Sequence, residues 1–447
     1  MLMHTIYFVS LGCDKNRVDS EYMLALLDRQ GFVPVDDPRE AEAAVINTCA
    51  FVLDAQEESV ETILEFAEYK QTGKLKVLIV AGCMAQRFQD EIREEVPEVD
   101  VVLGASSYDK IAEAALAALG GAGACIIDDP DRTPRVSERM VSTPPHYAYL
   151  KIAEGCAKRC TYCIIPYLRG SYRSVPMEEL ACEARTLAAR GTKELILVAQ
   201  ETTLYGIDLY GEKKLPQLLR LLSQTEGIEW IRLLYCYPEE ITEELITEIR
   251  ENPKVCHYLD LPIQHMNDSI LRRMGRRATG DGIRALIGHL RSEIPDIVLR
   301  TTLIAGFPGE TQQMHDALLE DLEEVRFDRL GVFPYSPEDG TPAASFPDQV
   351  DEEMKNAWAD EIMALQQDLI FEENERLTGT VLDVMIDGYL PEEGVYVGRS
   401  YRDTPDVDGL VFAQSDRMLM SGDRIKVLVT DANGYDLKGV EVHESAE

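Results

Sequence analysis

The sequence predicts an α/β protein with two parallel α/β regions followed by a small β-barrel. β-rich segments alternate with helical segments along most of the chain, which is typical of parallel sheets. A segment rich in Gly, Pro and charge at about 120–145 separates two such stretches. The last ~70 residues contain only short β-rich runs with turn residues between them, which indicates a small all-β domain.

The first ~120 residues repeat one arrangement three times. A β-rich run ends each time in a cysteine, in HTIYFVSLGC, AAVINTC and KVLIVAGC, and helical patterning follows. Right-handed crossovers make such strands parallel, and the carboxyl ends of parallel strands meet at one edge of the sheet, where ligands bind. We therefore expect Cys13, Cys49 and Cys83 to converge.

These three thiols have two interpretations. In the first interpretation they are core or loop cysteines that happen to follow strands, because free cysteine is often buried. Their equivalent places in three units favour a metal or cluster site instead. Zinc would normally need a fourth protein ligand, and no histidine stands at an equivalent position, since His4 begins the first strand at its opposite end. An iron–sulfur cluster with one iron left open fits better.

The second region is expected to contain six βα units. Its strand candidates are YAYLKIAEGC, ELILVAQET, IEWIRLLYCYP, CHYLDLPIQH, IVLRTTLIAG and RLGVFPYS. They predict an incomplete parallel (β/α) barrel with its chemistry at the carboxyl ends of the strands. The acidic amphipathic segment DEEMKNAWADEIMALQQDLIFEENERL is expected to be a helix that connects this barrel to the C-terminal domain.

Three more cysteines follow the first of these strands, in GCAKRCTYCIIP. Cys156, Cys160 and Cys163 have the spacing Cys-x3-Cys-x2-Cys, which matches neither ferredoxins nor paired CxxC zinc sites. The loop resembles that of the radical S-adenosylmethionine (SAM) superfamily, in which three cysteines hold a 4Fe-4S cluster and the fourth iron binds SAM. The resemblance implies reductive cleavage of SAM to a 5′-deoxyadenosyl radical.

Two cysteine sites in one chain resemble the methylthiotransferases, whose domains are an N-terminal cluster domain, a radical SAM barrel and a β-barrel called TRAM. We expect these domains at 1–120, 141–373 and 376–443. SLGCDKNRVDSE, AQETTLYG, YLDLPIQHMND, RTTLIAGFPGET and YSPEDGTPA look like the RimO branch. That branch methylthiolates the β-carbon of an aspartate in small-subunit ribosomal protein twelve. One alternative is the sister MiaB branch, which modifies an adenosine in tRNA. Another is a non-catalytic module that binds an iron–sulfur cluster or zinc.

The resemblance also implies cofactors and site residues. Two 4Fe-4S clusters are implied, one held by Cys156, Cys160 and Cys163, and an auxiliary one held by Cys13, Cys49 and Cys83. SAM would serve as methyl donor and as radical source. The residues implied to contact SAM are Tyr162, Gln200 and Arg300, the latter two at strand ends, and Ile304 to Gly306.

Structural roles are the alternatives for several residues. Arg300 could form an ordinary barrel salt bridge and Gln200 a structural hydrogen bond. Cys125, Cys182, Cys236 and Cys256 have no spacing partner, and the last two are expected in the core. His257 and His265 are expected to be structural rather than proton carriers.

Charge and cysteine usage bear on the partner and the compartment. With 44 Lys+Arg against 80 Asp+Glu, the net charge of −36 argues against a general nucleic-acid binder and favours a basic partner, although an acidic host proteome would produce the same balance. The start reads as a strand rather than a signal peptide, and no apolar run approaches roughly 18 residues. Ten cysteines then predict a reducing cytoplasm.

The expected partner is ribosomal protein twelve, with no membrane and no tRNA substrate. Residues 376–447 contain 14 Asp+Glu against 7 Lys+Arg, a net charge of −7, and ribosomal proteins are typically basic. We expect this segment to help dock the protein substrate, through Asp403, Asp406 and Asp408 among others. The alternative is that these acids only keep the domain soluble. The sulfur donor and the electron donor stay open.

Overall fold

The computed structural model describes residues 3–134, 136 and 138–442. It divides into two compact units. The first contains the chain through Ser142, together with 153–173 and 336–344, and the second contains 143–152, 174–335 and the chain from Ser345 onward. The expected domain division stays a prediction, and the first residue of the expected N-terminal domain and the last of the expected TRAM segment, 443, lie outside the described residues.

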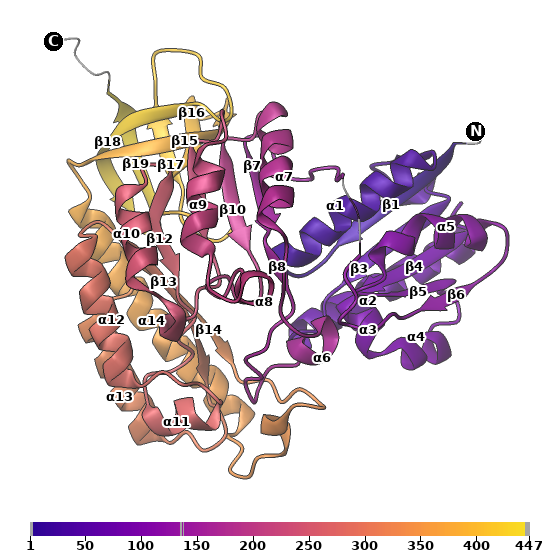
Figure 1. Cartoon of the computed structure of the whole chain (residues 1–447), viewed down its shortest axis with the longest axis horizontal. Helices are drawn as coiled ribbons and strands as arrows, with labels where there is room; N and C mark the ends of the chain where they lie inside the picture. The colour runs from indigo at the N-terminus through magenta and orange to yellow at the C-terminus, as the bar shows by residue number, and fades with distance from the viewer. Residues whose placement is uncertain (1–2, 135, 137, 443–447) are drawn as a thin grey trace. The chain divides into compact units, whose positions relative to one another are not determined.

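The first unit is built on a six-stranded parallel sheet with the strand order β2-β1-β3-β4-β5-β6 (Figure 1). The strands are β1 (His4–Ser10), β2 (Phe32–Pro34), β3 (Ala43–Thr48), β4 (Val77–Gly82), β5 (Val101–Gly104) and β6 (Ala124–Ile126). The helices are α1 (Asp14–Arg29), α2 (Leu53–Thr72), α3 (Cys83–Arg87), α4 (Gln89–Glu95), α5 (Ile111–Leu119) and α6 (Ile165–Arg169). The short strands β8 (Ala153–Glu154) and β9 (Arg173–Ser174) stand at the two ends of the segment that carries α6.

The three predicted cysteine-bearing strands, β1, β3 and β4, are neighbours in this sheet. β3 and β4 are buried along their whole length, as expected for apolar strands covered on both faces. Cys125 lies in β6, and the short strands β2 and β5 were not predicted. The parallel α/β fold predicted for this region is confirmed.

Two apolar layers enclose the first sheet because successive strand residues face opposite sides. Val45 and Ile79 pack on one side with residues of α1 and α5. Ile46 and Val80 pack on the other side with residues of α2 and α3. Ile164 and Leu168, from the cysteine loop at 153–173, belong to this second layer, so the loop is anchored in the same core as the sheet.

The second unit contains another six-stranded parallel sheet, with the order β14-β13-β12-β11-β10-β7. The strands are β7 (Tyr147–Lys151), β10 (Glu194–Val198), β11 (Trp230–Leu233), β12 (Val255–Asp260), β13 (Val298–Ala305) and β14 (Arg329–Pro334). The helices are α7 (Met177–Ala189), α8 (Ile207–Tyr210), α9 (Leu215–Ser223), α10 (Glu243–Glu251), α11 (Asp268–Arg273), α12 (Gly280–Glu293), α13 (Gln312–Val325) and α14 (Glu352–Arg376). All six predicted strands are present in an open sheet, which confirms the incomplete barrel.

A closed five-stranded barrel, drawn in yellow in Figure 1, completes the second unit. Its strands are β15 (Val381–Leu390), β16 (Val395–Ser400), β17 (Val411–Gln414), β18 (Arg424–Asn433) and β19 (Asp436–Glu441). Closure leaves no unpaired strand edge. The predicted acidic helix is α14, which contacts β13, β14 and β18 and so joins the two sheets. No helix among the described residues is long and apolar enough to cross a membrane.

Candidate functional site

Three cysteines lie at the carboxyl edge of the first sheet. Cys13 precedes α1, Cys49 directly follows β3, and Cys83 directly follows β4. The register pairs Ser10 of β1 with Asn47 of β3 and also brings the ends of β3 and β4 together, so all three strands finish at the same edge. The convergence expected from the parallel topology is therefore observed.

Two glycines permit this close approach. Gly12 has a φ of +86°, and an added Cβ there would lie 2.8 Å from Cβ and 3.0 Å from Sγ of Cys49. Gly82 has a φ of +92°, and an added Cβ would lie 2.7 Å from the carbonyl oxygen of Thr48. Both backbone conformations are in the region that glycine adopts without strain, so the cysteine-bearing turns depend on glycine immediately before Cys13 and Cys83.

Burial favours the protonated thiols of Cys49 and Cys83 in the absence of a ligand. The pKa of Cys49 is raised to about 12, first by burial and then by the nearby Cys83 and Cys13. Burial also raises the pKa of Cys83, although Arg169 opposes the shift. Metal binding would therefore release protons here, because only the thiolate is a ligand.

The second cysteine group lies in the 153–173 loop of the same compact unit. The N–H of Cys156 donates to the carbonyl oxygen of Gly170 at 3.1 Å, and the N–H of Cys163 donates to that of Cys160 at 3.0 Å. Arg159 has a φ of +51°, so the turn between the first two cysteines includes a left-handed residue. Burial, followed by the neighbouring Cys160, raises the pKa of Cys163. Tyr162 is half-buried in this loop.

The donor chemistry of both groups fits an iron–sulfur cluster. Each offers three thiols, and most of these are buried. Within the part of the chain that the structure describes, no three His, Cys, Asp or Glu side chains are arranged to hold a single metal ion. A 4Fe-4S cluster binds each cysteine through a different iron, so its ligands surround a cluster rather than one ion.

The two cysteine-bearing loops are supported by polar residues that the sequence patterns did not reveal. Arg169, at the end of α6, donates from Nε to Sγ of Cys83 at 3.3 Å. Arg87, at the end of α3, contacts Glu338 at 2.6 Å and the carbonyl oxygen of Ala50 at 3.3 Å, which attaches the 336–344 segment beside Cys49. No spacing rule identifies such residues, because their roles depend on contacts across the fold.

The other predicted cofactor residues belong to the second unit. Gln200 is half-buried and follows β10 by two residues. Ile304 lies near the end of β13, and Gly306 comes directly after that strand. The N–H groups of Gly306 and Phe307 donate to Oε2 of Glu310 at 2.7 and 3.1 Å, so this carboxylate holds the turn in place.

His265 contacts the carboxylate of Glu310 that holds this turn, and its role is structural, as expected. Its side chain is fully buried and its Nε2 lies 3.2 Å from Oε1 of Glu310. Nδ1 accepts hydrogen bonds from the backbone N–H groups of Met266 and Asn267, so the proton is on Nε2. The other expected structural histidine, His257, lies 2.7 Å from Asp296.

The position of Arg300 differs from the one expected. It is the third of the eight residues of β13 rather than a residue at the carboxyl end. Its guanidinium lies 3.2 Å from Asp260 and 3.7 Å from Asp408, so the alternative of a barrel salt bridge is realised. Its role in SAM binding stays a prediction.

The docking role predicted for Asp403, Asp406 and Asp408, in the loop at 402–409, is wrong for two of these three aspartates. Asp403 accepts from Arg329 at 2.6 Å, and Asp408 accepts from the Tyr258 hydroxyl at 2.8 Å. Both carboxylates are buried, and burial raises the pKa of Asp408 against the opposing effect of Arg329. The loop turns these acids inward because they compensate buried arginines of the parallel sheet, and only Asp406 is exposed.

A buried ion network joins the parallel sheet to the small barrel within the second unit. Glu194, fully buried at the start of β10, lies 2.8 Å from Arg232 and 2.9 Å from Arg399. Arg399 also lies 2.9 Å from Asp387, which is 2.7 Å from His146. Burial by itself would raise the pKa of Glu194, but the two guanidinium groups outweigh it and hold that pKa below its ordinary value.

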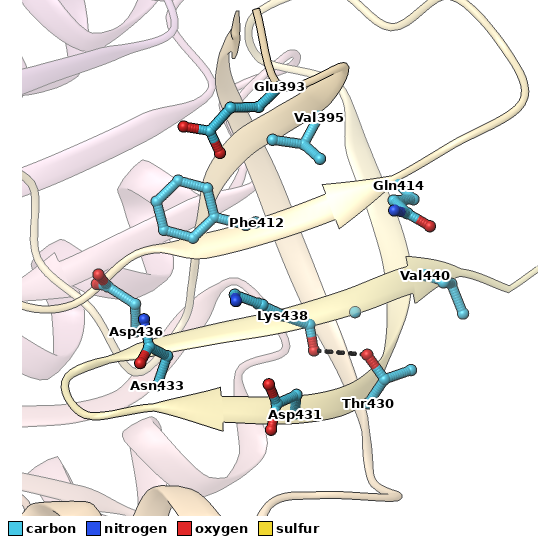
Figure 2. A pocket seen from close by; sticks show the side chains of 11 residues that line it. Glu393, Val395, Phe412, Gln414, Thr430, Asp431, Asn433, Asp436, Lys438 and Val440 are labelled. Atoms are coloured by element: carbon cyan, nitrogen blue, oxygen red, sulfur yellow. Dashed lines mark hydrogen bonds between the residues drawn. The ribbon is translucent and has the colours of Figure 1, made fainter.

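The small barrel has a groove of about 590 Å³ on its outer surface (Figure 2). Figure 2 shows Phe412 and Lys438 on neighbouring strands, with acidic side chains around them. The groove contains three carboxylates and one ammonium group. The lining residues are Glu393, Val395, Phe412, Gln414, Thr430, Asp431, Asn433, Asp436, Lys438, Gly439 and Val440.

The four remaining cysteines are two buried and two exposed residues. Cys236 and Cys256 are buried in the second unit, which confirms their predicted place in the core. Cys125 and Cys182 are exposed.

Three family models match the chain. They are the uncharacterized protein family UPF0004 over residues 5–104, the radical SAM superfamily over 150–322 and the TRAM domain over 378–442. Among solved structures, the radical SAM methyltransferase TsrM from Kitasatospora setae superposes with a TM-score of 0.54 at 14% identity, over 89% of this chain and 81% of its own. The cobalamin-dependent radical SAM enzyme OxsB has a TM-score of 0.52 at 13% identity, over 82% and 56%. These two likenesses show the fold alone.

Relatives in sequence are much more similar. Ribosomal protein uS12 methylthiotransferase RimO of Lachnoclostridium phytofermentans is 54% identical over 435 residues, which cover 97% of this chain and 99% of the relative. The proteins of the same name from Clostridium botulinum (strain Loch Maree) and Acetivibrio thermocellus are each 48% identical over 98% of both chains. Identity at this level over whole chains supports the RimO branch and not the MiaB alternative. The chain therefore belongs to the RimO family of ribosomal protein uS12 methylthiotransferases.

Proposed function

We propose that the chain methylthiolates the β-carbon of an aspartate in ribosomal protein uS12, using two 4Fe-4S clusters and SAM. The observation that carries the proposal is the pair of three-cysteine sites in one compact unit of a chain that is 54% identical to a uS12 methylthiotransferase. Cys156, Cys160 and Cys163 would hold the cluster that serves SAM, and Cys13, Cys49 and Cys83 the auxiliary cluster. The reaction would take place in the cytoplasm, where ribosomes and reduced thiols are found.

The bound cofactors supply the radical, the sulfur and the methyl group, and the protein's own groups hold and shield them. Glycine turns before Cys13 and Cys83 let the thiols approach one another. Burial of Cys49, Cys83 and Cys160 keeps water from the sites. Glu310 fixes the turn after β13. Ile304 to Gly306 would contact the adenosyl group of SAM. Tyr162, Gln200 and Arg300 are the remaining proposed SAM contacts.

The proposal is tested by offering both candidate substrates to the same enzyme. The anaerobically reconstituted full chain is incubated with SAM, reductant and sulfide, together with either uS12 or unmodified tRNA. We expect mass spectrometry to find a methylthio group on one aspartate of uS12 and none on tRNA. Methylthiolated adenosine without modified uS12 would overturn the substrate assignment.

We further propose that the groove on the small barrel contributes to docking uS12. Its carboxylates, Glu393, Asp431 and Asp436, form an acidic rim around Phe412. Acidic and aromatic groups complement a basic protein, and such charge complementarity increases the association rate and orients the partner. Because Asp403 and Asp408 are buried in ion pairs, this groove replaces them as the expected contact surface.

Charge reversal in the groove is expected to weaken uS12 binding several-fold. Replacing Glu393 and Asp431 with lysine turns attraction into repulsion for a basic partner, mainly by slowing association. The control carries the same charge change at Asp416 and Asp368, which are exposed and do not line the groove. Surface plasmon resonance should show weaker binding for the groove variant than for the control. Wild-type affinity should also fall as salt shortens the screening length towards ~8 Å. Equal affinities of the two variants for uS12 would show that the groove does not contribute to docking.

A further inference from the structure

Arg169 connects the two cysteine sites. It is the last residue of α6, in the loop that carries Cys156, Cys160 and Cys163, and its side chain is only 4% exposed. Its guanidinium nevertheless reaches the other site, where Nε donates to Sγ of Cys83 at 3.3 Å. This side chain therefore contacts a proposed ligand of the auxiliary cluster from within the radical SAM loop.

All three guanidinium nitrogens of Arg169 are engaged. Nη1 donates to Asp19 at 2.6 Å and to Glu154 at 3.3 Å, and Nη2 donates to Oδ1 of Asn16. Asn16 and Asp19 are in α1, the helix that begins directly after Cys13, and Glu154 is two residues before Cys156. The planar guanidinium is thus oriented by neighbours of both cysteine groups, with Nε left to face the sulfur.

The surrounding charges show what this contact can do. Asp19 is as buried as Arg169, and its carboxylate offsets part of the positive charge of Arg169. Arg169 therefore acts on Cys83 through its positive charge and through an N–H aimed at the sulfur. Hydrogen bonds to ligand sulfurs stabilise the additional negative charge of a reduced iron–sulfur cluster and are one of the determinants of its potential.

We propose that Arg169 is a positioning residue that hydrogen-bonds the auxiliary cluster's ligand Cys83, raises the reduction potential of that cluster and fixes the radical SAM loop against α1. When the auxiliary cluster is reduced, it takes up one electron from an external reductant, and no bond of the protein breaks. The inference rests on the proposed two-cluster function. A purely structural Arg169, serving only to neutralise Asp19 and Glu154, would leave the potential unchanged.

The test isolates the auxiliary cluster. In a full chain with Cys156, Cys160 and Cys163 replaced by alanine, only the auxiliary cluster should remain, and its potential is measured by reductive titration followed by EPR. Arg169→Lys keeps the positive charge and Arg169→Gln keeps a neutral donor, but neither retains the Nε–H held by three partners. Both are expected to shift the potential to more negative values. The matched control is Arg139→Lys, because Arg139 is equally buried and pairs with Glu21 of the same helix α1 at 2.8 Å.

The possible outcomes separate this inference from the proposed function. Loss of all iron from the background variant with Arg169 intact would contradict the two-cluster function itself. Retained iron with an unshifted potential in both Arg169 variants would overturn the role of Arg169 alone. If those variants fail to fold, pulsed EPR on the background variant grown with isotope-labelled arginine decides the question. A nitrogen coupling to the cluster supports the hydrogen bond, and its absence overturns it.

Discussion

Replacing Cys156, Cys160 and Cys163 with alanine is expected to abolish SAM cleavage while about half of the iron remains bound. Two 4Fe-4S clusters correspond to about eight irons in the unaltered protein, and each three-cysteine site would hold one cluster. The two proposed sites would use separate ligands on separate loops, so removal of one set should leave the other intact. Iron and sulfide analysis after anaerobic reconstitution, with chromatography for 5′-deoxyadenosine, measures both quantities.

The reciprocal variant provides the control. With Cys13, Cys49 and Cys83 replaced by alanine, we again expect about half of the iron. SAM should still be cleaved reductively, but uS12 should gain no methylthio group. Zinc in place of iron, or complete loss of iron from either variant, would contradict two independent sites.

Replacing Glu194 with alanine is expected to lower the free energy of unfolding of the second unit by about 3–5 kcal/mol, because it leaves the buried Arg232 without its counter-charge and Arg399 with Asp387 alone. Glu194 and Arg232 are both fully buried, and Arg399 is 3% exposed. The two tryptophans, Trp230 and Trp358, both belong to this unit, so their fluorescence during urea unfolding reports on it.

A surface pair serves as the control for Glu194. Glu229 contacts Lys193 at 2.6 Å, but both side chains are about a third exposed. Its replacement with alanine should cost only about 0–1 kcal/mol, since exposed ion pairs are weak. Equal destabilisation by the two substitutions would show that the buried network does not hold the small barrel to the parallel sheet.

The Glu194 contribution should also depend on pH. Burial opposes the charged form, but Arg399 and Arg232 keep the pKa of the folded state below the ordinary 4.5. A lowered folded-state pKa means that the contribution is complete above the unfolded-state pKa and is lost as pH falls through the folded-state value. The difference in stability between wild type and Glu194→Ala should therefore shrink below about pH 4.5 and stay constant above it. A difference that persists in acid would contradict the ionic explanation.

Local patterns were sufficient to predict the architecture. Apolar runs that alternate with helical segments predicted both parallel sheets, and the short runs after residue 376 predicted the small barrel. Cys13, Cys49 and Cys83 could be grouped from the sequence, because strand ends of a parallel sheet meet at one edge. The three-residue strand β2 escaped prediction because so short a run carries no periodic signal.

Contacts between distant segments could not be predicted in this way. Asp403 and Asp408 looked like exposed loop acids, yet they face Arg329 and Tyr258, which are at least 70 positions earlier in the chain. Arg300 looked like a strand-end residue, but the register of β13 places it two residues from the strand's beginning. In each case the sequence pattern did not reveal the partner, because the partner belongs to another strand or loop.

The sequence by itself determined the cysteine sets, the alternation of strands and helices, and the family, because each depends on residue type and local spacing. Only the tertiary structure decided that Arg169 reaches Cys83, that Glu194 lies between two arginines, and that Asp403 and Asp408 point inward. The physical reason is that a buried charge must find its counter-charge or hydrogen-bond partner in three dimensions. Packing of the elements determines which residue becomes that partner, and the distance between two residues along the sequence does not reveal it.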